Sequence, residues 1–315
     1  MSAGIQSVIS FVKETTWGTA VTPNKSIAVR PEGGITTKVD TQLIPAVKGL
    51  LAKNYNAIKG KTEHGGDFSF DLFADYVGHF LLSAHGSDSA ATHSGESIVY
   101  DHTFSDSVTK PSYTIEQAIG ENIRRYAGSI VSGYKIEGKP GEMIMFSPTI
   151  MAKTQASASA IAPAFTTVPA FNFAQAAVKI GGSTIGEVES IEIEYKNGLE
   201  MVYGLGSNEP LYYSINGGAE VSVKIDLYLD STSLTRFSNY LALTNEAIEL
   251  ILTGGSIGSA ANYMLDYLIP KAYYTSGETK INDAHNLLSV QADGIYDTAT
   301  STLVKPILTN LVASY

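Results

Sequence analysis

The sequence contains no cysteine, which excludes disulfides, thiolate metal sites and cysteine nucleophiles. It also lacks any apolar run near the roughly 18 residues that a membrane span requires, so we expect no membrane anchor. Residues 1–11 lack the basic start and apolar core of a secretory signal. We therefore expect a soluble protein that is made in the cytoplasm and held together by packing, backbone pairing or assembly.

An excess of basic residues is missing as well. The formal net charge is −10. Residues 161–315 hold 7 Lys and Arg against 16 Asp and Glu, whereas the first 160 residues hold 14 against 15. Because an acidic protein repels nucleic-acid phosphates, we do not expect it to grip DNA or RNA.

Signatures of catalysis are also lacking. Gly60-Lys61-Thr62 matches the end of a phosphate-binding loop, but Tyr55 stands where that motif requires its first glycine. The six histidines do not show zinc-ligand spacing, and no Gly-x-Ser-x-Gly elbow occurs between a strand and a helix. We therefore assign no catalytic, cofactor-binding or metal-binding residue and expect no enzymatic activity. A hydrolase with a scattered Ser-His-Asp triad stays open as an alternative, because members of a triad need not be neighbours in sequence.

A strand followed by a helix, by contrast, occurs twice, about half the chain apart. The first copy alternates over 65–72 and continues with helical spacing from Asp75 to Leu81; the second alternates over 217–227 and continues from Asp230 to Leu241. Alternation with period 2 predicts a strand with one polar and one apolar face. Each Asp can cap the first turn of the helix that follows. A duplicated unit without a catalytic signature points to architecture.

The remaining pattern predicts a mainly β chain with two similar halves. Residues 154–170 are poor in charge and rich in Ala, Ser, Thr and Pro, which is typical of linkers. We divide the chain into a first domain at 1–153 with an N-terminal arm at 1–25, a linker at 154–175, and a second domain at 176–315. Further strands are predicted at 26–30, 34–39, 98–104, 112–118, 129–137, 142–152, 176–180, 187–195, 246–252, 262–273 and 286–291.

Two stretches between predicted strands, 41–62 and 196–216, are irregular and too apolar for free loops. Because they hold the same position in both halves, we expect them to bury against another subunit rather than fold back on their own domain. Their apolar residues are Leu43, Ile44, Val47, Leu50, Leu51, Leu199, Met201, Val202, Tyr203 and Leu205.

Rows of carboxylates run along one face of several predicted strands. Side chains two residues apart on a strand lie on the same face, about 7 Å from each other. Such a face can be turned to bulk water or to a water-filled channel, and the sequence leaves both open. The carboxylates in these rows are Asp67, Asp71, Glu192, Glu194, Glu220 and Asp226.

Several short motifs resemble a known family. Glu14-Thr15-Thr16-Trp17-Gly18-Thr19 is similar to a Glu-x-x-aromatic-Gly-Thr opening, and similarity continues through 112–116, 126–131, the spacer and the second half. On these motifs the chain resembles the tail tube (major tail) proteins of long-tailed, siphovirus-type bacteriophages, in a variant with two tube domains. No single residue in the motifs is diagnostic.

The resemblance implies a mainly β fold of two tandem tail-tube-type domains, each made of two packed antiparallel sheets, β-sandwich or barrel-like, with one flanking α-helix. It implies a structural virion protein, made in the host cytoplasm, that self-assembles into stacked rings and forms the tail tube. With two domains in each chain, a homotrimeric ring with pseudo-sixfold symmetry is expected. The expected partners are further copies, the tape-measure protein, the tail terminator and distal tail proteins, and DNA in transit without specific binding. No cofactor is expected.

On this resemblance the six carboxylates are candidates for the channel lining, and 41–62 and 196–216 match the loops through which rings and subunits contact each other. The alternative is a two-domain β-sandwich adhesin or carbohydrate-binding module, with Tyr212-Tyr213 or Tyr273-Tyr274 as aromatic platforms. Tyrosines in strands are more often half-buried packing residues.

Overall fold

Antiparallel strands make up most of the computed structural model, which describes residues 7–45, 49, 51, 53–281 and 285–315. The predicted mainly β fold class is confirmed. The strands of the first half are β1 (Ser7–Lys13), β2 (Lys25–Ile27), β3 (Val29–Gly33), β4 (Thr36–Pro45), β5 (Asn54–Asp71), β6 (Gly86–Thr92), β7 (Tyr100–Asp106), β8 (Tyr113–Ile119), β9 (Asn122–Gly138), β10 (Met145–Ala152) and β11 (Thr154–Ser157). Those of the second half are β12 (Ala176–Ile180), β13 (Ser183–Ile185), β14 (Val188–Lys196), β15 (Leu199–Val202), β16 (Tyr212–Ile215), β17 (Glu220–Tyr228), β18 (Asn245–Ile257), β19 (Ala261–Lys280), β20 (Leu287–Gly294) and β21 (Lys305–Asn310). The helices are α1 (Val77–His85), α2 (Ser231–Leu241) and a short 3-10 turn, η2 (Phe173–Gln175).

Two sheets pack around α1 in the first half. The short sheet has the order β2–β1–β8–β9–β11, and the long sheet begins with β5, β10 and the second part of β9. Every residue of α1 is buried. The ring of Phe80 on α1 lies 5.3 Å from that of Phe11 in the short sheet, and 5.3 and 6.2 Å from those of Phe70 and Phe146 in the long sheet. The apolar faces that the alternation predicts thus meet on the two sides of the helix.

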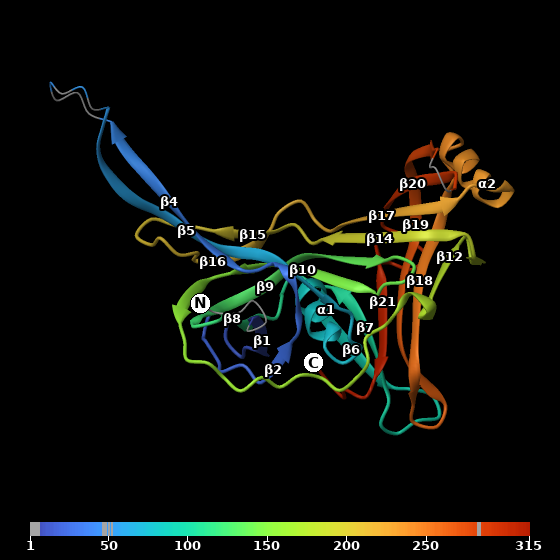
Figure 1. Cartoon of the computed structure of the whole chain (residues 1–315), viewed down its shortest axis with the longest axis horizontal. Helices are drawn as coiled ribbons and strands as arrows, with labels where there is room; N and C mark the ends of the chain where they lie inside the picture. Colours follow the sequence, from blue (N-terminus) through green and yellow to red (C-terminus); the bar gives the residue numbers. More distant parts are fainter. Residues whose placement is uncertain (1–6, 46–48, 50, 52, 282–284) are drawn as a thin grey trace.

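The long sheet continues from the first half into the second (Figure 1). β9 pairs with β14, which places Ile136 opposite Ile193, and the order then runs β14–β17–β20–β19. A second junction forms where the last strand, β21, pairs with β7. One apolar cluster fills both halves. The predicted division into two domains stays a prediction, and two ladders join the halves that it would separate.

The two helices start differently. The carboxylate of Asp230 accepts a hydrogen bond from the backbone N–H of Ser233 at 2.6 Å, so this predicted cap of α2 is present. The predicted cap at Asp75 is wrong, because Tyr76 precedes α1 without a side-chain cap and the Asp75 carboxylate accepts from the hydroxyl of Thr166 instead. A helix buried on all sides is stabilised by its packing more than by its cap.

Where the structure describes the stretch 41–62, most of it is paired strand, which corrects the prediction that it is irregular. β4 and β5 pair from Thr36 opposite Gly65 to Pro45 opposite Asn54 and form a two-stranded arm that extends away from the body (Figure 1). The pairing of β5 with β10 ends at His64. The part of β5 that precedes His64 is about 30 Å long at the usual rise of a strand. Register shifts between 39 and 41 and between 44 and 45 break the alternation, which hides the strands in the sequence.

The strands predicted at 26–30 and 34–39 do not pair with each other. Both β3 and β4 pair with β5, at different places along it. The predicted linker is packed as well: it begins with β11 on β9, and the carbonyl of Ala164 accepts from the N–H of Ser26 at 2.8 Å and from the hydroxyl of Tyr76 at 3.1 Å. This spacer therefore lies on the first half.

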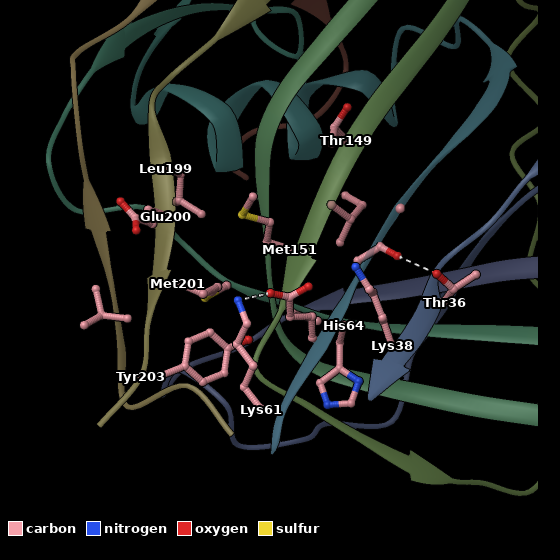
Figure 2. Close-up of a pocket in the computed structure, with 16 residues that line it drawn as sticks. Thr36, Lys38, Lys61, His64, Thr149, Met151, Leu199, Glu200, Met201 and Tyr203 are labelled. Atoms are coloured by element: carbon pink, nitrogen blue, oxygen red, sulfur yellow. Dashed lines mark hydrogen bonds and ion pairs between the residues drawn. The ribbon is translucent and has the colours of Figure 1, made fainter. Parts of the chain in front are cut away.

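The second irregular stretch, 196–216, also contains paired strands, β15 and β16, and it lies beside the base of the arm (Figure 2). The hydroxyl of Tyr203 donates to the carbonyl of Thr62 at 2.9 Å, and the N–H of Thr62 donates to the carbonyl of Asn208 at 2.8 Å. Nε2 of His64 is 2.9 Å from the carboxylate of Glu209. A segment of the second half thus braces an arm of the first.

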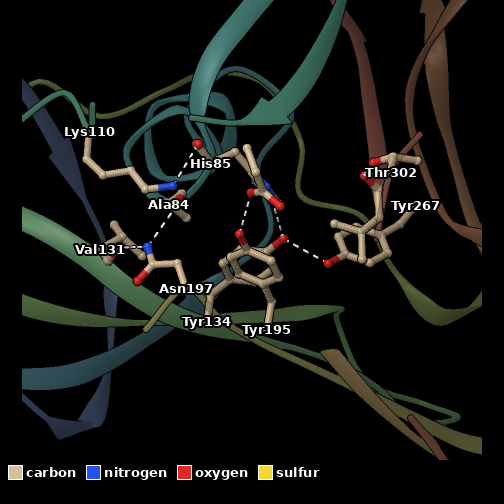
Figure 3. A network of polar contacts seen from close by, with 11 residues as sticks. Ala84, His85, Lys110, Val131, Tyr134, Tyr195, Asn197, Tyr267 and Thr302 are labelled. Atoms are coloured by element: carbon tan, nitrogen blue, oxygen red, sulfur yellow. Dashed lines mark hydrogen bonds and ion pairs between the residues drawn. The ribbon is translucent and has the colours of Figure 1, made fainter. Parts of the chain in front are cut away.

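A buried polar chain joins the halves near the end of α1 (Figure 3). His85 lies 2.9 Å from the carboxylate of Asp106 through Nδ1 and 2.8 Å from the hydroxyl of Tyr134 through Nε2. The hydroxyls of Tyr134 and Tyr267 are 2.9 Å apart, and Tyr195 donates to Asp106. Because Tyr195 and Tyr267 come from β14 and β19, this satisfied network fixes how the second half sits on the first.

We expect the substitution Tyr134→Phe to lower the free energy of unfolding by about 1–3 kcal/mol, because it leaves buried polar atoms of His85 and Tyr267 without a partner. Urea unfolding of the unassembled protein measures this. Tyr212→Phe, at an exposed position, is the control and should change stability little. Equal unfolding midpoints for the two variants would contradict the role of the network.

Acid is expected to destabilise the fold through His79. Burial lowers the pKa of His79 from 6.5 to about 3, so below pH 6.5 the unfolded chain binds a proton that the folded chain does not. The free energy of unfolding should therefore decrease as the pH is lowered below 6.5. This group contributes up to about 1.4 kcal/mol per pH unit. In the His79→Gln variant, the free energy of unfolding should decrease less steeply between pH 6.5 and 4 than in the parent. The control is His285→Gln, at an exposed position, and its curve of unfolding free energy against pH should be parallel to that of the parent. Parallel curves for all three proteins would refute the assignment.

Candidate functional site

All six carboxylates of the predicted rows lie on one face of the long sheet. Residues directly opposite in antiparallel strands share a face, and the register yields continuous rows across both halves. The first row is Asp71, Met145, Glu137, Glu192, Lys224 and Gln291. The second is Ser69, Ser147, Lys135, Glu194, Ser222 and Asp293. The third is Asp67, Thr149, Gly133, Lys196 and Glu220. Asp226, two residues after Lys224, adds to the same face.

This face is acidic with interspersed lysines. Glu192 is 3.1 Å from Lys135, Glu194 is 3.1 Å from Lys196, Asp226 is 3.8 Å from Lys280, and Asp71 pairs with Arg30. Asp67 and Glu220 have no ion pair within the part of the chain that the structure describes. Since such exposed pairs are weak, the excess of carboxylates sets the sign of the potential over the face.

The other side of the same strands is apolar. Ile191, Ile193 and Tyr195 on β14, and Val223 and Ile225 on β17, are buried in the core. The alternation therefore turns the charged side chains to one surface of the sheet and leaves no freedom for a one-residue slip. The sheet presents a charged surface that spans both halves of the chain.

The arm exposes apolar side chains. Leu43 on β4 and Ile58 on β5 are exposed, Leu51 at the tip is fully exposed, and Ile44 is half-buried. Val47 and Leu50 lie outside the described residues. A two-stranded ribbon with apolar side chains in water is marginal on its own.

The apolar residues of 196–216 are mostly used within the copy. Leu199 is buried, Met201, Val202 and Tyr203 are half-buried, and Leu205 is exposed. The first four line a groove of about 740 Å³ between β15 and the base of the arm, together with Ile150 and Met151 of β10 (Figure 2). The two stretches therefore differ: 41–62 belongs to the projecting arm, and 196–216 packs beside the base of that arm.

Within 7–45, 49, 51, 53–281 and 285–315, no group of three or more His, Asp or Glu could hold a metal ion, and no helix is long and apolar enough to cross a membrane. In each aromatic pair one tyrosine is engaged within the copy, and Tyr212 of the first pair is exposed. Tyr274 is buried with its hydroxyl on Glu246, and the hydroxyl of Tyr213 accepts from the N–H of Lys110 at 3.0 Å.

The rows contain residues that the sequence analysis did not single out. Glu137 and Asp293 add carboxylates to the face, and Lys135, Lys196 and Lys224 interrupt it. Each of them follows the polar–apolar alternation of its own strand, so the sequence did indicate that its side chain lies on the polar face. What placed them beside the six candidates is the register between strands far apart in sequence, which alternation alone does not fix.

The comparison with protein families agrees with this architecture. A family model described as phage tail tube protein matches residues 4–294. The search of curated proteins finds no match. Since the family model covers most of the chain, the protein belongs to the phage tail tube protein family and has a structural role in the tube of a phage tail.

Proposed function

We propose that copies of this chain close into rings, that the rings stack into the tail tube, and that the charged face of the long sheet lines the bore through which DNA passes. The observation that carries the proposal is the single face shared by Asp67, Asp71, Glu192, Glu194, Glu220 and Asp226 across both halves. A charged surface of that extent, backed by a core on its other side, suits a water-filled channel.

The ends of the long sheet support ring closure. At one end β3 pairs with β5 alone among the described strands, and at the other end residues 275–280 of β19 pair with β20 alone. Unpaired edges are a liability in a lone copy. Pairing residues 275–280 of β19 in one copy with β3 of the next removes both edges. Because each copy supplies two similar halves, we propose a trimeric ring with pseudo-sixfold symmetry.

Electrostatics support passage of DNA without binding. Carboxylates in excess repel phosphates, so a duplex is not held at the wall. The lysines on the face lie among carboxylates, as Lys135 and Lys196 do with Glu192 and Glu194, which limits their attraction for phosphates. No catalytic role is proposed.

The arm is proposed to join one ring to the next. It projects about 30 Å from the body and carries exposed Leu43, Leu51 and Ile58, and the brace from β15 and β16 holds its base. The tape-measure protein inside the tube, and the terminator and distal proteins at its ends, complete the proposed set of partners.

Electron microscopy of purified protein should show stacked rings with an open channel. The double substitution Leu43→Asp with Leu51→Asp should leave folding intact and permit single rings but abolish stacking, because charged residues replace the apolar contacts between rings. Val108→Asp with Leu311→Asp, at exposed apolar positions off the arm, is the control and should stack normally. Normal tubes from the arm variant would refute the role of the arm, and a parent that never forms rings would refute the assembly.

Charge reversal on the bore should make tubes retain DNA. Glu220→Lys places a new cation on the charged face in every copy, so assembled tubes are expected to bind duplex DNA at low salt and to release it as salt rises. Glu121→Lys, exposed in the turn between β8 and β9, makes the same change of charge elsewhere. Gel-shift and sedimentation assays compare the two. Equal retention by both variants would show that Glu220 does not face the DNA path.

A further inference from the structure

Helix α2 leaves its outer side uncovered. Leu234, Leu241 and Leu243 are 45%, 70% and 69% exposed, whereas Phe237 and Tyr240 on the inner side pack toward Gly277 of β19. The single charged residue of α2 is Arg236, which is buried and paired with Glu246. The exposed surface of α2 is therefore uncharged: Leu234 and Leu241 stand on one flank of it, and polar residues such as Thr235 and Ser238 are exposed beside them.

Leu243 is held in a conformation that leucine avoids. Its φ is 51°, in the left-handed region where glycine or asparagine ends a helix at less cost. Leu243 lies directly after the end of α2, where its N–H donates to the carbonyl of Tyr240 at 3.2 Å. A strained residue whose large apolar side chain points into water is explained when that side chain makes a contact outside the copy.

The equivalent helix of the first half shows what is missing. α1 follows β5 as α2 follows β17, and α1 is buried between the long sheet and the short sheet. α2 packs on β19 and β20, and Leu234 and Leu241 stay exposed.

An apolar groove lies at the other end of the molecule. It measures about 670 Å³ and runs between β1, β3 and β8. Arg30, paired with Asp71, is the one charged side chain among the described residues that line it. Its apolar lining includes Val8, Ile9, Val29, Phe68, Ile119 and Phe165, of which Ile119 and Phe165 are exposed.

The order of strands places these two surfaces at the same junction of a ring. α2 packs on β20 and on β19, whose first part pairs onward with β18 and whose residues 275–280 pair with β20 alone, and the groove is bordered by β3, at the opposite edge of the sheet. In Figure 1 the two surfaces lie far apart in one copy. When sheets close into a ring, the last strand of one copy meets the first strand of the next, and α2 then comes to the groove of its neighbour.

We infer that α2 of one copy seats its leucines in the groove between β1, β3 and β8 of the next copy in the ring. This rests on the proposed ring assembly and adds the contact that holds neighbours together outside the bore. It is a helix-in-groove contact in which the exposed leucines of an uncharged helix surface meet an apolar groove with one charged lining residue, Arg30, which is paired with Asp71. The sheet edges then supply backbone pairing at the inner side of the junction, and the helix supplies apolar burial at the outer side.

The absence of native cysteine allows a direct test by cross-linking. In the full chain, Leu241→Cys combined with Ile119→Cys is expected to give covalent multimers up to the size of one ring, by oxidation or with a short bismaleimide. The controls are each single substitution and the pair Leu241→Cys with Val108→Cys, in which Val108 is exposed and outside the groove. The controls should not give covalent multimers up to the size of a ring. If rings are visible and neither chemistry links the pair, this inference is overturned while the ring stands. If the parent forms no rings, the proposed function itself fails.

Leu243→Gly separates docking from folding. Glycine accepts the left-handed conformation, so the unassembled copy should melt no lower than the parent. Loss of one docked leucine should weaken ring formation by about tenfold in protein concentration, as measured by mass photometry. Leu234→Asp with Leu241→Asp should abolish rings. Normal assembly by both variants would overturn the contact.

Discussion

The pairing of β9 with β14 is the contact on which the rest of the structure depends. It joins the two halves of the chain into one sheet, and it sets Glu137 opposite Glu192 and Lys135 opposite Glu194. Without this register the carboxylates of the first half and those of the second would belong to separate surfaces. The buried chain from His85 through Tyr134 to Tyr267 lies against the same junction and fixes its geometry. A continuous charged face is thus a consequence of backbone pairing that side-chain hydrogen bonds make specific.

The same sheet explains why one copy looks incomplete. β3 and residues 275–280 of β19 keep unpaired edges. The arm exposes leucines, and α2 is more exposed than α1. Each feature would cost a solitary protein solubility. In the proposed assembly, they occur at the positions where identical neighbours meet in a ring or between rings. We therefore regard them as parts of one assembly surface distributed over the molecule.

The sequence predicted much of this architecture, for physical reasons that differ between elements. Strands such as β14 and β17 were predicted because one face is buried and the other wet, which gives a strict alternation, and Asp230 was found because a cap is a local signal. The arm was missed because both faces of β4 are exposed and bulges shift its register. Asp75 was misread because the burial of α1, which is not local, replaced the need for a cap. The sharing of one face by all six carboxylates required the register between distant strands, and the brace of Tyr203 on Thr62 joins residues 141 positions apart.

The orientation of the long sheet in the assembled tube is the most direct test of the account. A cryo-electron microscopy reconstruction of tubes made from the purified chain would place every strand relative to the tube axis. We predict that Glu192, Glu194 and Glu220 point into the bore and that strand order continues from β19 of one copy to β3 of the next. A reconstruction in which this face lies on the outer wall, or is buried between rings, would contradict the account.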